Sequence, residues 1–197
     1  MSAAKKRGSS QPKGAPGAIP WRRILGYGVA GLAIVLLIAA IVQGTLSEPA
    51  GGIPEGTREV DPGEPLHVES DIYGPDEVPA GGPHSPIWAN CGFYDTPIAA
   101  ENAVHSLEHG AVWITYRPDL AASEIAALRD LVSGRRKVLA SPVLQTDPLM
   151  ATAWGYQLSL ETTEDPRLQQ FLAEFAGSLS APEPGASCSG GVGVPVG

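Results

Sequence analysis

A long apolar run near the N-terminus dominates the hydropathy pattern. Residues 24–42 are 19 residues without a charge, and Trp21, Arg22 and Arg23 directly precede them. An α-helix of about 20 apolar residues crosses a hydrocarbon core of roughly 30 Å. The alternative, a cleaved signal peptide, has a shorter apolar region. The pattern therefore predicts a single transmembrane helix over residues 21–43.

The polar segments around this run predict the domain organisation. Residues 1–20 are rich in Ser, Gly, Pro and Lys, which predicts a disordered basic tail. Residues 44–66 have the Pro, Gly and Glu composition of a linker. A globular domain is expected over residues 67–180, followed by an extended tail at 181–197.

Three segments of the domain have the composition of strands. Residues 111–116 are β-branched and aromatic, and residues 137–141 are expected to form a short second strand. Apolar and polar side chains alternate along residues 151–160, which predicts one strand with a single apolar face.

Two helices are expected between and after these strands. Ser123 is positioned to cap a helix that Gly134 ends, and Asp165-Pro166 opens a last helix that ends at Gly177. The order strand–helix–strand–strand–helix predicts an α+β fold with a small mixed sheet, in which two strands are parallel and one is antiparallel. A long loop of His, Pro, Gly and aromatic residues precedes it, and a thioredoxin-like arrangement is one solution.

Charge divides the chain into two parts. Six of the 13 Lys and Arg residues lie within residues 1–46, where there is no acid, and the remainder of the chain has a net charge of −14. Basic residues beside an apolar helix stay in the cytoplasm, which predicts a protein of the cell membrane with its C-terminal domain outside. Such an acidic domain does not suit a nucleic-acid partner, because phosphates favour Lys and Arg.

Both cysteines, Cys91 and Cys188, belong to the part predicted to lie outside the cytoplasm. Cysteine pairs in that environment are more often bridged than free. The sequence therefore predicts a Cys91–Cys188 disulfide.

Side chains that could bind a metal ion cluster in one part of the chain. All the histidines fall within 43 residues: His67, His84, His105 and His109. A short helix is expected over residues 100–109, and there His105 and His109, spaced i, i+4, project from one face and can chelate one ion. The predicted site combines His84, His105 and His109 with His67 or Glu108. Imidazole ligands suit zinc or copper, and ligand type alone does not choose between them.

Two other interpretations of these residues remain open. The segment His105-Ser-Leu-Glu108-His109 matches the H-x-x-E-H pattern of zinc peptidases, in which the Glu activates water. The long helix of those enzymes is missing, because Gly110 and a strand follow at once, so a hydrolase is disfavoured. The other alternative is a structural or interaction protein of the cell envelope, with an unidentified partner, in which the histidines only brace the loop.

Several motifs resemble those of a bacterial family called domain of unknown function 3105. They are Gly-Pro-His84-x-Pro-x-Trp88-Ala, His105-x-Leu-Glu108-His109-Gly and Ala-Thr-Ala-Trp154-Gly-x-Gln-Leu. The resemblance covers about residues 58–190. It implies an N-terminal membrane segment and one extracytoplasmic domain, and it names no activity. One departure is the sequence Gly81-Gly82-Pro83, where members usually read Ser-Gly. We therefore expect a membrane-tethered extracytoplasmic module that binds metal rather than an enzyme.

Overall fold

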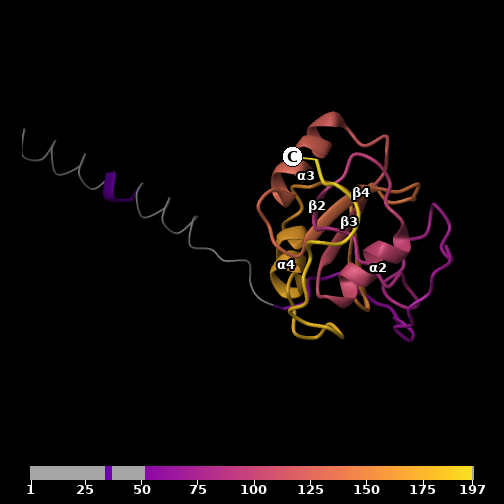
Figure 1. Cartoon of the computed structure of the whole chain (residues 1–197). Helices are drawn as coiled ribbons and strands as arrows, with labels where there is room; N and C mark the ends of the chain where they lie inside the picture. Colours follow the sequence, from indigo (N-terminus) through magenta and orange to yellow (C-terminus); the bar gives the residue numbers. More distant parts are fainter. Residues whose placement is uncertain (1–33, 37–51, 197) are drawn as a thin grey trace, which may run out of the picture. The chain divides into compact units, whose positions relative to one another are not determined.

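The computed structural model describes residues 34–36 and 52–196. The latter range folds as α+β, with a six-stranded mixed sheet and three helices (Figure 1). Its elements in chain order are β1 (Arg58–Glu59), β2 (Gly92–Phe93), α2 (Ala100–Glu108), β3 (Val112–Tyr116), α3 (Ala122–Val132), β4 (Val138–Pro142), β5 (Leu149–Ala153), β6 (Tyr156–Leu160) and α4 (Pro166–Phe175).

The sheet is built around a parallel pair of strands. Strand order is β1-β6-β5-β3-β4-β2, with β3 parallel to β4 and β4 parallel to β2. On the other side of β3, the strands β5, β6 and β1 each run antiparallel to their neighbour. The predicted parallel pair and its antiparallel neighbour are therefore present, but within a larger sheet.

Helices cover both faces of the central strands. Val112 and Ile114 of β3 share one apolar core with α3 and α4, whereas Trp113 shares a second core with Ala103 and Leu107 of α2. Figure 1 shows the sheet between α2 on one side and α3 and α4 on the other. All five residues of β3 and all five of β4 are buried. Strands buried on both faces are typical of sheets with helices on each side.

The helix ends differ in how well local sequence predicts them. Asp165 caps α4 as expected, because its side chain accepts a hydrogen bond from the backbone N–H of Arg167 at 2.9 Å, and Pro166 opens the helix. The prediction that Ser123 caps α3 is wrong. The N-cap is Ala121, which forms no side-chain cap, and Ser123 lies inside the first turn.

The single strand predicted over residues 151–160 is also wrong. The chain turns back at Trp154-Gly155, and the flanking segments pair as the antiparallel hairpin β5–β6. Gly155 has a φ of 78°, which glycine adopts without the strain that a side chain would add. Alternation of apolar and polar residues continues across the turn, so periodicity alone does not reveal it.

The predicted transmembrane helix is corrected by the structure. Across the described ranges 34–36 and 52–196, no helix has the length and apolar character needed to cross a membrane. The expected location in the cell membrane depended on this helix and is corrected with it. The rest of the predicted helix at 21–43, the basic tail at 1–20 and residues 44–51 of the linker lie outside the described residues.

Both ends of the described domain reach beyond the predicted boundaries. Strand β1 falls within the segment expected to be a linker, yet its residues pair with Tyr156 and Gln157 of β6. At the other end, Val192 forms an isolated bridge with Ala89, and the N–H of Val196 donates to the carbonyl of Phe93 at 2.7 Å. The chain therefore joins the sheet earlier than residue 67 and stays packed on it after residue 180.

We expect the substitution Ser141→Ala to destabilise the domain by about 1–3 kcal/mol, because it orphans a buried donor. The indole N–H of Trp113 donates to Ser141 Oγ at 2.9 Å, and both residues are 0 % exposed. Urea unfolding measures the loss. The matched control is Ser123→Ala in α3, an exposed position where a change of less than about 0.5 kcal/mol is expected. Equal losses in the two variants would contradict this role of Ser141.

Candidate metal centre

Helix α2 carries three of the predicted donors. Its buried Ala103 and Leu107 pack on the sheet, and this fixes the rotation of the helix about its axis. His105 lies in the last turn, Glu108 is the final helical residue, and His109 is the C-cap. All three are at least 95 % buried.

Gly110 lets the chain leave α2 and enter β3 directly. Its φ is 82°, and a Cβ at this position would lie 3.1 Å from the carbonyl oxygen of Ser178. Its N–H donates to the carbonyl of Leu107 at 2.8 Å and closes the last turn of the helix. The short helix and immediate strand exclude the long active-site helix that the H-x-x-E-H peptidase interpretation needs.

His84 reaches the site on a loop that is held at several points. Its backbone pairs with the segment around His67: the N–H of Val68 donates to the carbonyl of His84 at 2.7 Å, and the N–H of His84 to that of Leu66 at 2.8 Å. The hydroxyl of Tyr73 donates to the carbonyl of Pro83 at 2.8 Å. The His84 side chain is 0 % exposed.

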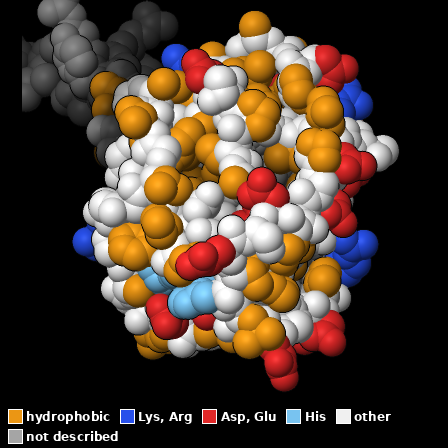
Figure 2. Space-filling model, turned by 45° about the vertical axis from the view of Figure 1, so that its right-hand side comes forward, with side chains coloured by type: hydrophobic (Ala, Val, Ile, Leu, Met, Phe, Trp, Pro, Cys, Tyr) orange, Lys and Arg blue, Asp and Glu red, His pale blue; other side chains and the backbone are white. Residues whose placement is uncertain are grey.

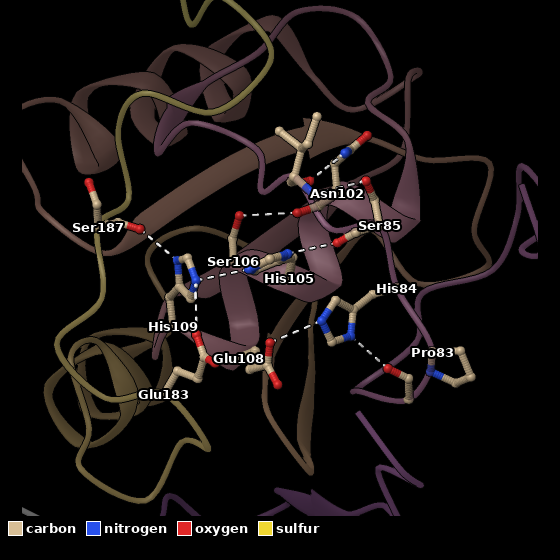
Figure 3. A network of polar contacts seen from close by, with 12 residues as sticks. Pro83, His84, Ser85, Asn102, His105, Ser106, Glu108, His109, Glu183 and Ser187 are labelled. Atoms are coloured by element: carbon tan, nitrogen blue, oxygen red, sulfur yellow. Dashed lines mark hydrogen bonds and ion pairs between the residues drawn. The ribbon is translucent and has the colours of Figure 1, made fainter. Parts of the chain in front are cut away.

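The three buried imidazoles are oriented in the same way (Figure 3). The Nδ1 atom of His84 lies 2.8 Å from the carbonyl oxygen of Gly82, that of His105 lies 2.7 Å from the carbonyl of Ser85, and that of His109 lies 2.6 Å from the carbonyl of Ser187. A carbonyl oxygen only accepts hydrogen bonds, so each Nδ1 must carry the proton. In the neutral ring, each Nε2 atom then has a free lone pair.

These Nε2 atoms face other acceptors. Nε2 of His105 lies 3.0 Å from Nε2 of His109, and Nε2 of His84 lies 3.0 Å from a carboxylate oxygen of Glu108. Glu183 contributes a carboxylate oxygen 3.5 Å from Nε2 of His109. Lone pairs this close repel one another, and a shared proton or a cation turns the repulsion into attraction.

Burial favours the neutral form of His105. Desolvation lowers the pKa of its ring below the ordinary value of 6.5, and the neighbouring His109 and His84 lower it further. The hydrogen bond to Ser85 and the charge of Glu108 act in the opposite direction without reversing the shift. At neutral pH, therefore, Nε2 of His105 presents a lone pair.

The donors form two groups that could each hold a metal ion. Atoms of His67, His84, His105 and Glu108 all lie within 4.8 Å of one another, and so do atoms of the second group, His105, His109 and Glu183. The structure thus brings together four of the five predicted donors and places the fifth, His109, with Glu183. His67 is the exposed member of the first group, and Figure 2 shows histidine atoms at the surface beside acidic side chains.

Glu183 is the donor that the sequence did not predict. It belongs to the segment expected to be an extended tail. The confirmed disulfide Cys91–Cys188 holds this segment against the domain, and the N–H of Glu183 donates to the carbonyl of Glu108 at 3.0 Å. The ammonium of Lys137 also donates to the carbonyls of His109 and Ala186. The only signal in the sequence is the short distance along the chain from Glu183 to Cys188.

Two hollows of the described surface are lined by residues other than the histidines. One of about 830 Å³ adjoins the disulfide and is lined by Arg135, Arg136 and Lys137. Another of about 480 Å³ lies at the start of α2, beside Tyr73 and Trp113. The buried donors therefore suit a ligand of the size of a single ion better than an organic molecule.

Comparison with known proteins identifies the family of the chain. The sequence model of a family described as "Protein of unknown function (DUF3105)" matches residues 67–190, which is more than half of the chain. The chain belongs to this family. No curated protein matches it. No solved structure matches it either, so the expected thioredoxin-like arrangement gains no support from known folds.

The region that matches the family contains the whole first donor group and Glu183. Gly81, in the motif that departs from the usual family pattern, has a φ of 147°, and a Cβ there would lie 2.5 Å from Cβ of Pro62. Glycine is therefore needed at this position so that the loop that carries His84 can pack closely on Pro62, which follows β1. The family description names no activity, so the function must be inferred from the site.

We expect Glu101→Gln to loosen the segment that supports the His84 loop. Glu101 is 5 % exposed, and its carboxylate accepts hydrogen bonds from the N–H groups of Ile72 and Tyr73 at 2.6 and 2.9 Å. The neutral amide should cost about 1 kcal/mol at pH 7, because hydrogen bonds to a charged acceptor are stronger.

The pH dependence of this effect follows from the pKa of Glu101. Burial raises this pKa, but the hydrogen bonds from Tyr73 and Ile72 outweigh burial and lower it below the ordinary 4.5. The charged form therefore stabilises the fold above about pH 4.5, and this contribution is lost as the pH falls through the folded-state pKa. Urea unfolding should show that the free energies of unfolding of the wild type and Glu101→Gln differ at pH 7 and become similar at pH 3.5. The control is the exposed Glu161→Gln, for which a constant small difference is expected. A difference in the free energy of unfolding that increases as the pH falls would contradict this role of the charged Glu101.

Proposed function

We propose that the domain binds a transition-metal ion, zinc or copper, through its histidine cluster. The observation that carries the proposal is the common orientation of His84, His105 and His109, in which each Nδ1–H donates to a backbone carbonyl. Histidines that bind a metal ion almost always donate their other ring N–H to a carbonyl or carboxylate, which fixes the tautomer and the ring orientation. The free Nε2 atoms are then the ligands.

The distance between the Nε2 atoms of His105 and His109 is close to that expected for two ligands of one metal ion. Two nitrogens bound to zinc at 2.0–2.1 Å in tetrahedral geometry lie about 3.3 Å apart. The 3.0 Å between the Nε2 atoms of His105 and His109 is close to this value. A small opening of the pair, by a few tenths of an ångström, would suffice for an ion to be coordinated.

Donor chemistry narrows the class of ion. Imidazole nitrogens with one or two carboxylates suit zinc and copper, whereas calcium and magnesium prefer oxygen ligands alone. The net charge of −14 beyond residue 46 attracts cations towards the domain. His67 is exposed at the edge of the cluster and gives an ion a route from solvent to the buried donors.

A bracing role without metal is the second candidate. The contact of 3.0 Å between His84 and Glu108 favours it, because a proton on His84 would make this a buried ion pair. Glu108 in contact with His84 is also less available as a base for water, which disfavours the hydrolase interpretation.

Metal should raise the melting temperature of the chain if the first candidate is correct. Free zinc at 100 times its Kd stabilises the folded state by about 2.7 kcal/mol, or roughly 10 °C for a domain of this size. His105 belongs to both donor groups, so His105→Ala should reduce the shift. Calorimetry of the metal-free chain with and without zinc or copper measures this.

The control is Glu161→Gln. Glu161 is exposed on the domain and belongs to neither donor group. This variant should melt at the temperature of the wild type and keep the full metal-dependent shift. If neither zinc nor copper shifts the wild type, metal binding is rejected and the bracing role stands.

A further inference from the structure

We propose that this site holds two metal ions, each bound by two histidines and one carboxylate. The first ion is bound by His67, His84 and Glu108. The second is bound by His105, His109 and Glu183. This inference rests on the proposed function, because it takes the binding of metal by the cluster as its premise.

The spacing of the donors argues against a single ion bound by all of them. Two ligands of one zinc ion cannot lie farther apart than twice the metal–nitrogen distance, about 4.2 Å. Among the described residues, donor atoms that lie within 4.8 Å of one another form two groups, and neither group contains both His84 and His109. The two histidines therefore bind different ions.

His105 can serve only one of the two ions. Its Nδ1–H is donated to the carbonyl of Ser85, so Nε2 is its one available ligand atom. That atom is 3.0 Å from Nε2 of His109, which places these two nitrogens around the same ion. Glu183, 3.5 Å from Nε2 of His109, completes this set.

The remaining donors form a set of the same composition. Nε2 of His84 and a carboxylate oxygen of Glu108 are 3.0 Å apart, and the ring of His67 lies 5.0 Å from that of His84. Each set has three protein donors, which leaves a coordination position for water or for an oxygen atom of an added ligand. Two histidines and a glutamate are also the protein ligands in several catalytic zinc sites.

Each set contains one carboxylate, whose negative charge offsets part of the repulsion between the two neighbouring cations. Two divalent ions in adjacent positions repel each other strongly in a buried environment. Glu108 and Glu183 each bring a negative charge, and the hydrogen bond between their backbones holds the two residues side by side. Close metal pairs of this kind bind bridging oxygen ligands, so water or a small oxyanion is the class of ligand that would join the ions.

The second set depends on a segment that the first set does not use. Glu183 supplies its carboxylate, and Ser187 supplies the carbonyl that orients His109. The disulfide Cys91–Cys188 anchors this segment one residue after Ser187. Substitutions here should therefore remove the second ion and leave the first in place.

Metal stoichiometry of the purified full-length chain tests the proposal. After removal of metal and equilibration with zinc, the wild type should bind two ions per chain. Glu183→Gln should bind one tightly, because its side chain is 56 % exposed and its loss does not disturb the core. The double variant Cys91→Ala, Cys188→Ala should also bind one, and His84→Ala should keep only the second ion. The control Glu161→Gln should bind two.

Copper gives an independent readout of proximity. Two Cu²⁺ ions in neighbouring positions couple magnetically, so the loaded wild type should show a half-field signal in electron paramagnetic resonance, and Glu183→Gln should not. One ion per wild-type chain, with a thermal shift, overturns the two-ion proposal and leaves the proposed function standing. No bound ion and no thermal shift overturn both. Loss of both ions from Glu183→Gln would show that the donors form one site.

Discussion

Burial of both faces of the β3–β4 pair is the constraint on which the rest of the domain depends. Strands that are buried on both sides need an apolar layer over each face, and α2 supplies one while α3 and α4 supply the other. Trp113 and Leu139 face α2, so this helix must turn Ala103 and Leu107 towards the sheet. The helix is amphipathic and its rotation is thereby fixed. The site is a consequence of that rotation.

A second requirement concerns backbone carbonyls. The carbonyls of Gly82, Ser85 and Ser187 each accept an Nδ1–H from a buried histidine, and they come from two loops far apart in the chain. The packed core supplies the position of the rings, and these hydrogen bonds supply their orientation. The disulfide contributes to this by holding the C-terminal segment beside His109, and closing a loop of this length stabilises a domain by about 4–5 kcal/mol in the chain-entropy account.

Metal binding and a purely structural role would use the same imidazole lone pairs in different ways. A proton shared between imidazoles would satisfy the lone pairs and leave a static network, whereas an ion would draw on the same lone pairs as ligands. Desolvation lowers the pKa of His105 and so disfavours the protonated network, which supports the metal interpretation. The position of an exposed His67 at the edge of an otherwise buried cluster also suits a site that exchanges its ligand with solvent.

Local signals in the sequence were sufficient for α2, β3, β4 and α4 and for the disulfide. Helical periodicity, the Asp165 cap and β-branched composition act over a few residues, and two cysteines leave one possible pairing. The spacing of His105 and His109 likewise places them on one face of a helix before any fold is known. Long apolar runs are a local signal too, and here that signal predicted a membrane helix that the described residues do not contain.

Tertiary structure alone decided the remaining features. The hairpin at Trp154-Gly155 keeps the apolar alternation of one long strand, so only strand pairing reveals it. Strands β1 and β2 have two residues each, too few for any pattern, and exist because a neighbouring strand offers hydrogen bonds. Glu183 becomes a donor because its backbone bonds to Glu108, 75 positions earlier in the chain. Sequence indicated that four histidines and Glu108 could bind a metal ion. Contacts between distant segments determined which of them meet and added Glu183, because no local pattern encodes the distance between residues so far apart.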